Sequence, residues 1–379
     1  MIYNASMGVC SIPLKSQCDL ILRLEDVRSM PKIDLHRHLT GSITPTIMKK
    51  VAAHFCDLHS FSSAEEEDRL FPKGNISSHQ DYFISWPLLS QLFHSIEVSR
   101  FTIRLILQEL ADDNVVYTEL RTSPKGLDNG EQYSFAEYLN LLLECSAWAE
   151  AELGIVVRWI IGIPRHEYSH LRDGEDIVAF FEDAISLATA FHPHCVVGWD
   201  LNGIEEVAGP RRFKGVFERI RAAGFDITVH AGETTPVEQV IEAVGLLGAT
   251  RIGHGISALL EYKTISCNEL RSVVYEVCPT SNQKLGVLRQ LAELPLPQAL
   301  RTGGPYLVIA SDNPGRLGTS LSMELYNYAR AHCLDITALR AMTTAALSYS
   351  FADPQTRSRI VERLYAEDLS SASLAPTFS

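Results

Sequence analysis

The chain has 379 residues, of which 46% are hydrophobic and 21% charged, and its formal net charge is −13. This composition is typical of a globular protein of enzyme size and excludes a disordered or fibrous chain. The negative charge argues against nucleic acid or an anionic membrane as a partner, since neither is attracted to that net field. The length fits two ordinary domains or one large α/β barrel, so the order of the elements has to decide.

The N-terminal residues and the cysteines predict the compartment. The first 20 residues lack a charged start followed by an apolar block, and no apolar stretch in the chain is long enough to span a bilayer. The eight cysteines form no CxxC pair and no disulfide framework, which suits a reducing compartment. We therefore expect a cytoplasmic protein with an N-terminal extension over residues 1–30; the sequence sets no oligomeric state.

Short apolar runs rich in β-branched residues alternate with longer amphipathic stretches, which predicts parallel strands joined by helices. The expected strands cover residues 32–38, 115–122, 155–163, 195–201, 226–232, 250–255, 273–278 and 306–311. Eight is the number of strands that closes a (β/α)8 barrel. The predicted fold is therefore α/β, a (β/α)8 TIM barrel that forms a single domain over residues 1–379.

The segments between the strands predict helices. Helical spacing of apolar residues is clear over 131–153, 211–224 and 322–334, and Gly154 follows the first as a C-cap. The interval from about 43 to 114 is too long for one helix, so we expect a helical insertion after the first strand, over the barrel mouth. Residues from about 370 to 379 are expected to form a flexible tail.

The insertion contains an aromatic segment, DYFISWPLLSQLF at 81–93. Its side chains Phe83 and Trp86 have two interpretations. They either cover a ligand or belong to the core, because apolar residues at helical spacing pack more often than they line a pocket.

Polar residues follow nearly every predicted strand, in the segments HRHLTG, ELRTSP, DLNG, HAGE, GHG, TSN and SDNPG. In barrels of this class the chemistry takes place at the C-terminal ends of the strands. His36 and His38 are two residues apart in the first strand, so they share one face. One such pair can also consist of ordinary core or surface histidines.

Three later strand ends strengthen a metal-site hypothesis, because they add His230, His254 and Asp312. Imidazole nitrogens and a carboxylate suit zinc and leave a position for water. Glu233 follows His230 by three residues, where it can transfer a proton beside the metal. Taken singly, the histidines can be hydrogen-bonded barrel residues, and Glu233 a carboxylate at a helix N-terminus.

These motifs together carry a family resemblance. HxH followed by LxGS, then HAGE, GHG and SDNP, resemble the adenosine deaminase family of the amidohydrolase barrels, from about residue 31 to 347. The resemblance implies that Glu233 protonates purine N1 and that His254 partners the hydroxide that attacks C6. It also implies one Zn²⁺ per chain, held by four ligands: His36, His38, His230 and Asp312.

The resemblance further implies a purine pocket, with four residues expected to meet the substrate: His38, Thr40, Gly203 and Asn313. Members that act on adenosine commonly have Asp where this chain has Thr40, and a neutral hydroxyl tolerates a 5′-phosphate better than a carboxylate does. Asn313 stands where much of the family has a second Asp, and its amide can donate to purine N7 at any pH. Arg121 and Lys125 in YTELRTSPKG either reach a phosphate or form barrel salt bridges.

The predicted function is zinc-dependent hydrolysis of a 6-aminopurine nucleoside to the 6-oxopurine, with release of ammonia. The alternative is release of methylamine from N6-methyl-AMP. The segment YTELRTSPKG is similar to the N6-methyl-AMP deaminases of the family. A purine-binding barrel without activity and a hydrolase of non-purine amides are further alternatives. The segment CVVGWDLNG has no lysine for a binuclear centre, and the chain lacks the PCxxC of cytidine-type deaminases.

Overall fold

The computed structural model describes residues 22–55, 63–78, 82–83, 86–127, 132–171, 174–264 and 267–364. The predicted tail and most of the N-terminal extension lie outside these ranges. The described part of the extension holds helix α1 (Leu24–Ser29). No helix in the described part of the chain is both long and apolar enough to cross a membrane.

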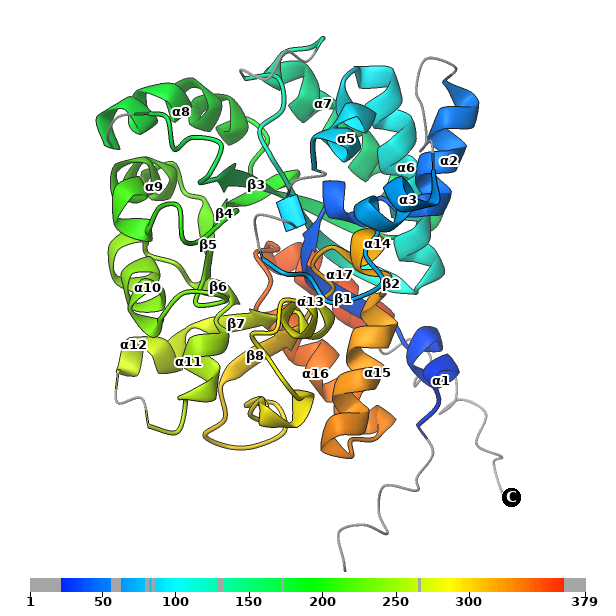
Figure 1. The fold of residues 1–379 in the computed structure, drawn as a ribbon, viewed down its shortest axis with the longest axis vertical. Helices are drawn as coiled ribbons and strands as arrows, with labels where there is room; N and C mark the ends of the chain where they lie inside the picture. Colours follow the sequence, from blue (N-terminus) through cyan, green and yellow to red (C-terminus); the bar gives the residue numbers. More distant parts are fainter. Residues whose placement is uncertain are drawn as a thin grey trace, which may run out of the picture.

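Eight parallel strands form one sheet in the order of the sequence, as predicted (Figure 1). An isolated parallel bridge between Arg37 and Asp312 joins the last segment to the first strand and closes the barrel. The strands are β1 (Lys32–His38), β2 (Val115–Thr122), β3 (Val156–Pro164), β4 (Val196–Asn202), β5 (Asp226–Ala231), β6 (Arg251–His254), β7 (Val274–Val277) and β8 (Tyr306–Ile309).

Helices surround the barrel (Figure 1). The predicted helix over 131–153 is α7 (Phe135–Trp148) continued by a π-helical turn (Ala149–Leu153), and Gly154 ends it in the left-handed conformation at φ 67°. The helices that follow it are α8 (Gly174–Thr189), α9 (Lys214–Ala222), α10 (Val237–Glu242), α11 (Ile256–Leu260), α12 (Asn268–Ser272), α13 (Pro279–Lys284), α14 (Pro314–Leu317), α15 (Leu321–His332), α16 (Ile336–Ser348) and α17 (Pro354–Leu364).

Several helices fill the interval between β1 and β2. Thr44 caps the first of them, because its hydroxyl accepts the Ile47 N–H and Pro45 occupies the first helical position. The helices are α2 (Pro45–His54), α3 (Ala64–Leu70), α5 (Trp86–Ser90) and α6 (Ile96–Asp112). The long helix α6 packs against α7 and β2, so it serves as the first helix of the barrel ring.

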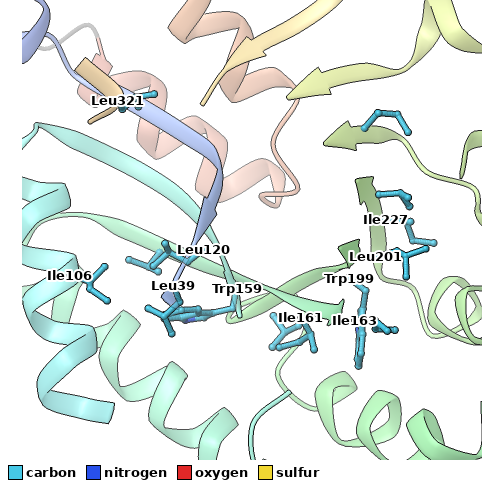
Figure 2. Close-up of a cluster of buried hydrophobic side chains, with 14 of the residues drawn as sticks. Leu39, Ile106, Leu120, Trp159, Ile161, Ile163, Trp199, Leu201, Ile227 and Leu321 are labelled. Carbon is cyan, nitrogen blue, oxygen red and sulfur yellow. The ribbon is translucent and has the colours of Figure 1, made fainter. Parts of the chain in front are cut away.

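The hydrophobic core lies between the strands and the helix ring. Trp159, Ile161 and Ile163 alternate along β3 and are fully buried, and Figure 2 shows them beside buried residues of neighbouring strands. Alternation with a period of two places the residues between them on the opposite face, inside the barrel.

The barrel interior is charged. Arg251 forms ion pairs with Glu119 and Glu276, both at 2.6 Å, and all three side chains are at most 1% exposed. Arg121 pairs with Asp200 at 2.9 Å and also contacts Glu276. Buried charges of this kind are tolerated only when they are paired, so the interior forms a neutralised layer below the strand ends.

The described cysteines only partly match the expectation of a reducing environment. Cys145, Cys195, Cys267 and Cys278 have free thiols. Cys333 is disulfide-bonded, which counts against a fully reduced set.

Candidate active site

A cluster of imidazoles occupies the C-terminal end of the barrel. The ring of His36 lies 5.3 Å from that of His38, 4.6 Å from His230 and 4.9 Å from His254, between centroids. Asp312 Oδ1 lies 3.6 Å from His36 Nε2 and 3.5 Å from His38 Nε2. Residues from four separate parts of the chain therefore meet where the sequence places them, although their roles as ligands stay predictions.

Two buried carboxylates orient the histidines. His36 Nδ1 is 2.7 Å from Glu276 Oε2, and His230 Nδ1 is 3.1 Å from Asp200 Oδ1. A carboxylate on one ring nitrogen fixes the proton there and leaves the other nitrogen as a lone-pair donor. The Nε2 atom of His230 that is left free faces a third imidazole, because it lies 3.2 Å from His38 Nε2.

The donor set fits a metal ion. His36 Nε2 is buried and has no hydrogen-bond partner, which is costly for a polar atom unless something binds it. Ligand atoms of His36, His38 and His230 lie within 4.8 Å of one another, and the same holds for His36, His254, Cys278 and Asp312. Nitrogen and carboxylate donors at such separations are those that zinc takes.

The protonation states of His38, His230 and Asp312 also suit metal binding. Burial lowers the pKa of His38 and of His230 well below the ordinary value, so both imidazoles are neutral. Burial acts in the opposite direction on Asp312, but His36 and the neighbouring imidazoles outweigh it and hold the pKa of this carboxyl well below its ordinary value. Neutral imidazoles and an ionised carboxylate are the forms that coordinate a cation.

The backbone is strained at two of these residues. His254 and Asp312 have φ of 64° and 61°, in the left-handed region that residues with a Cβ rarely adopt. Such strain persists only where the surrounding structure imposes it, and it concentrates at functional sites. His254 is the last residue of β6 and Asp312 follows β8 by three residues, and each side chain turns into the cluster there.

Glu233 and His254 form a pair beside the cluster. His254 Nδ1 lies 3.3 Å from Glu233 Oε1, and Asn282 Nδ2 contacts both groups, at 2.7 Å from the carboxylate oxygen and 3.1 Å from the imidazole nitrogen. Burial lowers the pKa of His254 to about 3, so its imidazole is neutral. The amide of Asn282 has two hydrogens and can satisfy both acceptors at once.

A pocket with about 690 Å³ of empty space opens above these residues. Three residues predicted to meet the substrate besides His38 line it: Thr40, Gly203 and Asn313. Phe83 and Trp86 also line the pocket, which favours their interpretation as a cover for a ligand. The ring of Phe83 lies 5.1 Å from that of His166, which follows β3.

Two glycines are required by close approaches in this pocket. Gly203 has φ of 85°, and a Cβ there would lie 2.4 Å from His166 Nδ1. A Cβ on Gly41 would lie 1.8 Å from Asn313 Oδ1, so the Asn313 amide rests where a side chain would be. The glycine of the LTGS segment thus lets Asn313 lie beside Asp312, to whose Oδ1 its Nδ2 donates at 2.7 Å.

Arg121 belongs to the barrel interior. Its guanidinium is fully buried and ion-paired with Asp200 and Glu276, which supports the salt-bridge alternative over phosphate binding. Lys125 is half-buried and does not belong to the described residues that line the pocket.

Several residues that shape the site were not singled out from the sequence. Asp200 and Glu276 are carboxylates inside otherwise apolar strands, and a charge in such a run requires a buried partner, so the signal was present. Asn282 stands in the polar TSN segment after the seventh predicted strand, and Glu205, which accepts the Glu233 N–H at 3.2 Å, stands in a polar loop with no distinguishing pattern.

A closed parallel barrel with histidines and a carboxylate at its strand ends defines an enzyme of the amidohydrolase type. The model of the family described as adenosine deaminase matches residues 31–367, so the chain belongs to this family. It is therefore a hydrolytic deaminase.

Curated relatives differ in substrate. The chain is 31% identical over 345 residues to the aminodeoxyfutalosine deaminase of Streptomyces coelicolor, covering 89% of this chain and 84% of that protein. It is 31% identical over 343 residues to the adenine deaminase of Chelativorans sp., covering 88% and 97%. The crystal structure of the Arabidopsis N6-mAMP deaminase MAPDA has a TM-score of 0.75 at 24% identity, covering 90% of this chain and 99% of that one, which shows the fold alone.

Proposed function

We propose that the chain binds one Zn²⁺ through His36, His38, His230 and Asp312 and hydrolyses a 6-aminopurine nucleoside to the 6-oxopurine and ammonia. The observation that carries this proposal is the buried, unpartnered His36 Nε2 facing neutral imidazoles and an ionised carboxylate. The names of the curated relatives support a purine with an exocyclic amine as the substrate class.

The chemistry then divides among few groups. A zinc ion at this site supplies Lewis-acid activation of water at neutral pH. The neutral imidazole of His254 holds the attacking water at C6 through Nε2, because its Nδ1 faces Glu233 and Asn282. The Glu233 carboxyl gives its proton to purine N1, which lets C6 accept the water oxygen. Collapse of the tetrahedral carbon expels the amine as ammonia: one proton of the water goes to the leaving amine and the other returns to Glu233, whose own proton stays on N1.

The remaining pocket residues orient the purine. The backbone N–H of Gly203 donates to N3, and the Asn313 amide donates to N7 with the hydrogen that Asp312 does not take. His38 and Thr40 line the pocket on the side of β1 and meet the substrate there. Phe83 and Trp86 exclude bulk water from the reacting face.

The charges of the pocket favour an uncharged nucleoside over a 5′-monophosphate. Arg121 is neutralised by two carboxylates, and Glu167, which is neither a proposed zinc ligand nor the proton donor, adds an acidic side chain to the pocket wall. A phosphate dianion would meet repulsion there. The feature that favours the second candidate, an N6-methyl-AMP deaminase, is the neutral Thr40 hydroxyl in the pocket wall.

We also propose that a single domain performs this reaction in the cytoplasm on a small molecule, with neither nucleic acid nor membrane as a partner. The test is ammonia or methylamine release by the zinc-loaded protein from adenosine, 2′-deoxyadenosine, adenine, AMP and N6-methyl-AMP at matched concentration. Preference for the free nucleosides supports the proposal. Preference for the monophosphates supports the second candidate, and no release from any adenine compound refutes both.

A further inference from the structure

The loop that carries Glu233 is built around one buried carboxylate. Glu205 is 1% exposed and accepts the backbone N–H groups of Glu233 and Thr234 at 3.2 Å each. It also accepts the N–H of Thr235 at 3.1 Å and the hydroxyl of Thr235 at 2.6 Å. Three consecutive N–H groups that converge on one point form a nest, an arrangement that binds anions. Here the anion is a side chain from the connection that follows β4.

The contacts of Glu205 are complete enough to hold it in one place. A buried carboxylate is costly unless it is hydrogen-bonded, and four donors here satisfy both of its oxygens. Charge-assisted hydrogen bonds of this kind are stronger than neutral ones. The connection after β4 and the loop after β5 are therefore held together by polar contacts.

Arg165 holds the same two segments from the other side. Its fully buried guanidinium donates to the His230 carbonyl oxygen at 2.6 Å. It also donates to three carbonyl oxygens after or at the end of β4, those of Leu201, Asn202 and Ala208. A cation thus fixes the end of β5, and an anion fixes the residues that follow it.

Glu233 is consequently fixed at two points. Its backbone N–H donates to Glu205, and its side-chain Oε1 accepts from Asn282 at 2.7 Å. We propose that Glu205 is a positioning residue of the deamination reaction, whose carboxylate fixes the backbone of residues 233–235 and so holds the Glu233 carboxyl beside His254. This inference rests on the proposed function. Glu205 is not among the described residues that line the pocket, so it acts through the loop and not on the substrate.

The experiment compares Glu205→Gln with Glu206→Gln in the zinc-loaded full chain. Glutamine has nearly the same shape, but its NH2 group faces N–H donors instead of accepting from them. Glu206 is the exposed neighbour of Glu205. The N–H groups of Thr234 and Thr235 donate to Glu205, so Glu206→Gln controls for the loss of one carboxylate from the same segment. The measured quantities are kcat and KM for adenosine, zinc per chain, and the affinity for inosine by direct titration.

For Glu205→Gln we expect kcat to fall on the order of 10²-fold, as for a small displacement of a catalytic group. KM, zinc content and inosine affinity should stay near those of the parent, and Glu206→Gln should resemble the parent throughout. Glu205→Asp keeps the charge and should recover part of the lost kcat. If Glu205→Gln does not fold, Thr235→Val removes one donor to Glu205, and a fall in kcat at constant KM is expected there as well.

Two results would overturn the inference. Parent-like kcat in Glu205→Gln would show that the nest does not position the acid. A loss of kcat matched by equal losses of zinc and inosine binding would show a general structural role. A parent chain that deaminates no adenine compound would instead refute the proposed function, and this inference with it.

Discussion

The two ends of the barrel treat buried polar groups differently. Near the N-terminal ends of the strands, Lys32 Nζ donates to the carbonyl oxygens of Val27, Arg28 and Met30 at 2.8–3.0 Å, and Arg251 is paired with two carboxylates. At the C-terminal ends, His36 Nε2 and Asn313 Oδ1 are buried without a hydrogen-bond partner. Arg251 Nε and Glu119 Oε2 also lack a hydrogen bond, but ion pairs at 2.6 Å neutralise them. Paired buried charges contribute to stability. Buried polar atoms without a hydrogen-bond partner destabilise the fold but are available to bind a ligand.

The charged interior connects these ends. Glu276 contacts Arg251 below and His36 above, and Arg121 joins Glu276 to Asp200, which in turn contacts His230. Burial opposes ionisation of Glu276, but Arg121, Arg251 and His36 outweigh it and keep the pKa of this carboxyl well below its ordinary value. Substitutions at the C-terminal ends of the strands should therefore affect turnover or metal binding, whereas substitutions near the N-terminal ends should affect stability.

The largest effect is expected at the C-terminal end, from Glu233→Gln. The amide cannot give a proton to purine N1, so turnover should fall by about 10²–10⁴-fold while zinc and inosine binding persist. Steady-state kinetics with metal analysis measure both. Glu238→Gln, at an exposed position of α10, is the matched control. Near-normal turnover in Glu233→Gln would refute its role as the acid.

The N-terminal end should respond in stability. Arg251→Ala leaves Glu119 and Glu276 buried without this cation, and removal of one partner of a buried pair lowers the free energy of unfolding by about 3–5 kcal/mol. Urea unfolding at fixed zinc measures it. Arg219→Ala breaks an exposed pair with Glu182 at 4.0 Å and should change little. Equal effects of the two variants would contradict the contrast between interior and surface.

Asp312→Ala tests whether the polar atoms at the C-terminal ends of the strands bind zinc. Loss of this proposed ligand, which faces His36 and His38, should lower zinc affinity by at least about 10²-fold, since loss of even a hydrogen-bond partner of a ligand costs about 10–100-fold. Competition with a chelator measures the affinity. Asp335→Ala, at the exposed N-cap of α16, is the control for removal of an aspartate. Full metal occupancy in Asp312→Ala at limiting zinc would count against Asp312 as a ligand.

Sequence periodicity predicted the barrel well because buried parallel strands are short apolar runs, which are easily told from the longer amphipathic helices between them. β1 and β2 match the expected ranges, and the others differ by one or two residues at their ends. The candidate residues at strand ends were found because polar side chains interrupt those runs. What was missed depends on tertiary geometry. Glu205 lies in an irregular segment and Asn282 in the short helix α13, and neither segment is long enough for a periodicity that indicates which way a side chain points.

The smallest effect is expected from Lys32, and it should depend on pH. Burial lowers the pKa of Lys32 to about 8 from its ordinary 10.5, so between these values the unfolded chain binds a proton that the folded chain does not. The contribution of Lys32 to stability should therefore rise with pH across this window. Lys32→Met abolishes that rise and leaves three carbonyl oxygens at the end of α1 without their donor, at a cost of about 1–3 kcal/mol.

The free energy of unfolding of parent and Lys32→Met should thus differ more at pH 10 than at pH 7.5. Lys50→Met, on the exposed face of α2, is the matched control for the loss of an exposed lysine. A constant difference for Lys32→Met would mean that Lys32 keeps an ordinary pKa in the folded chain. Since Asp113 and the three carbonyl oxygens favour the charged ammonium, that result would show that they fully offset the penalty of burial.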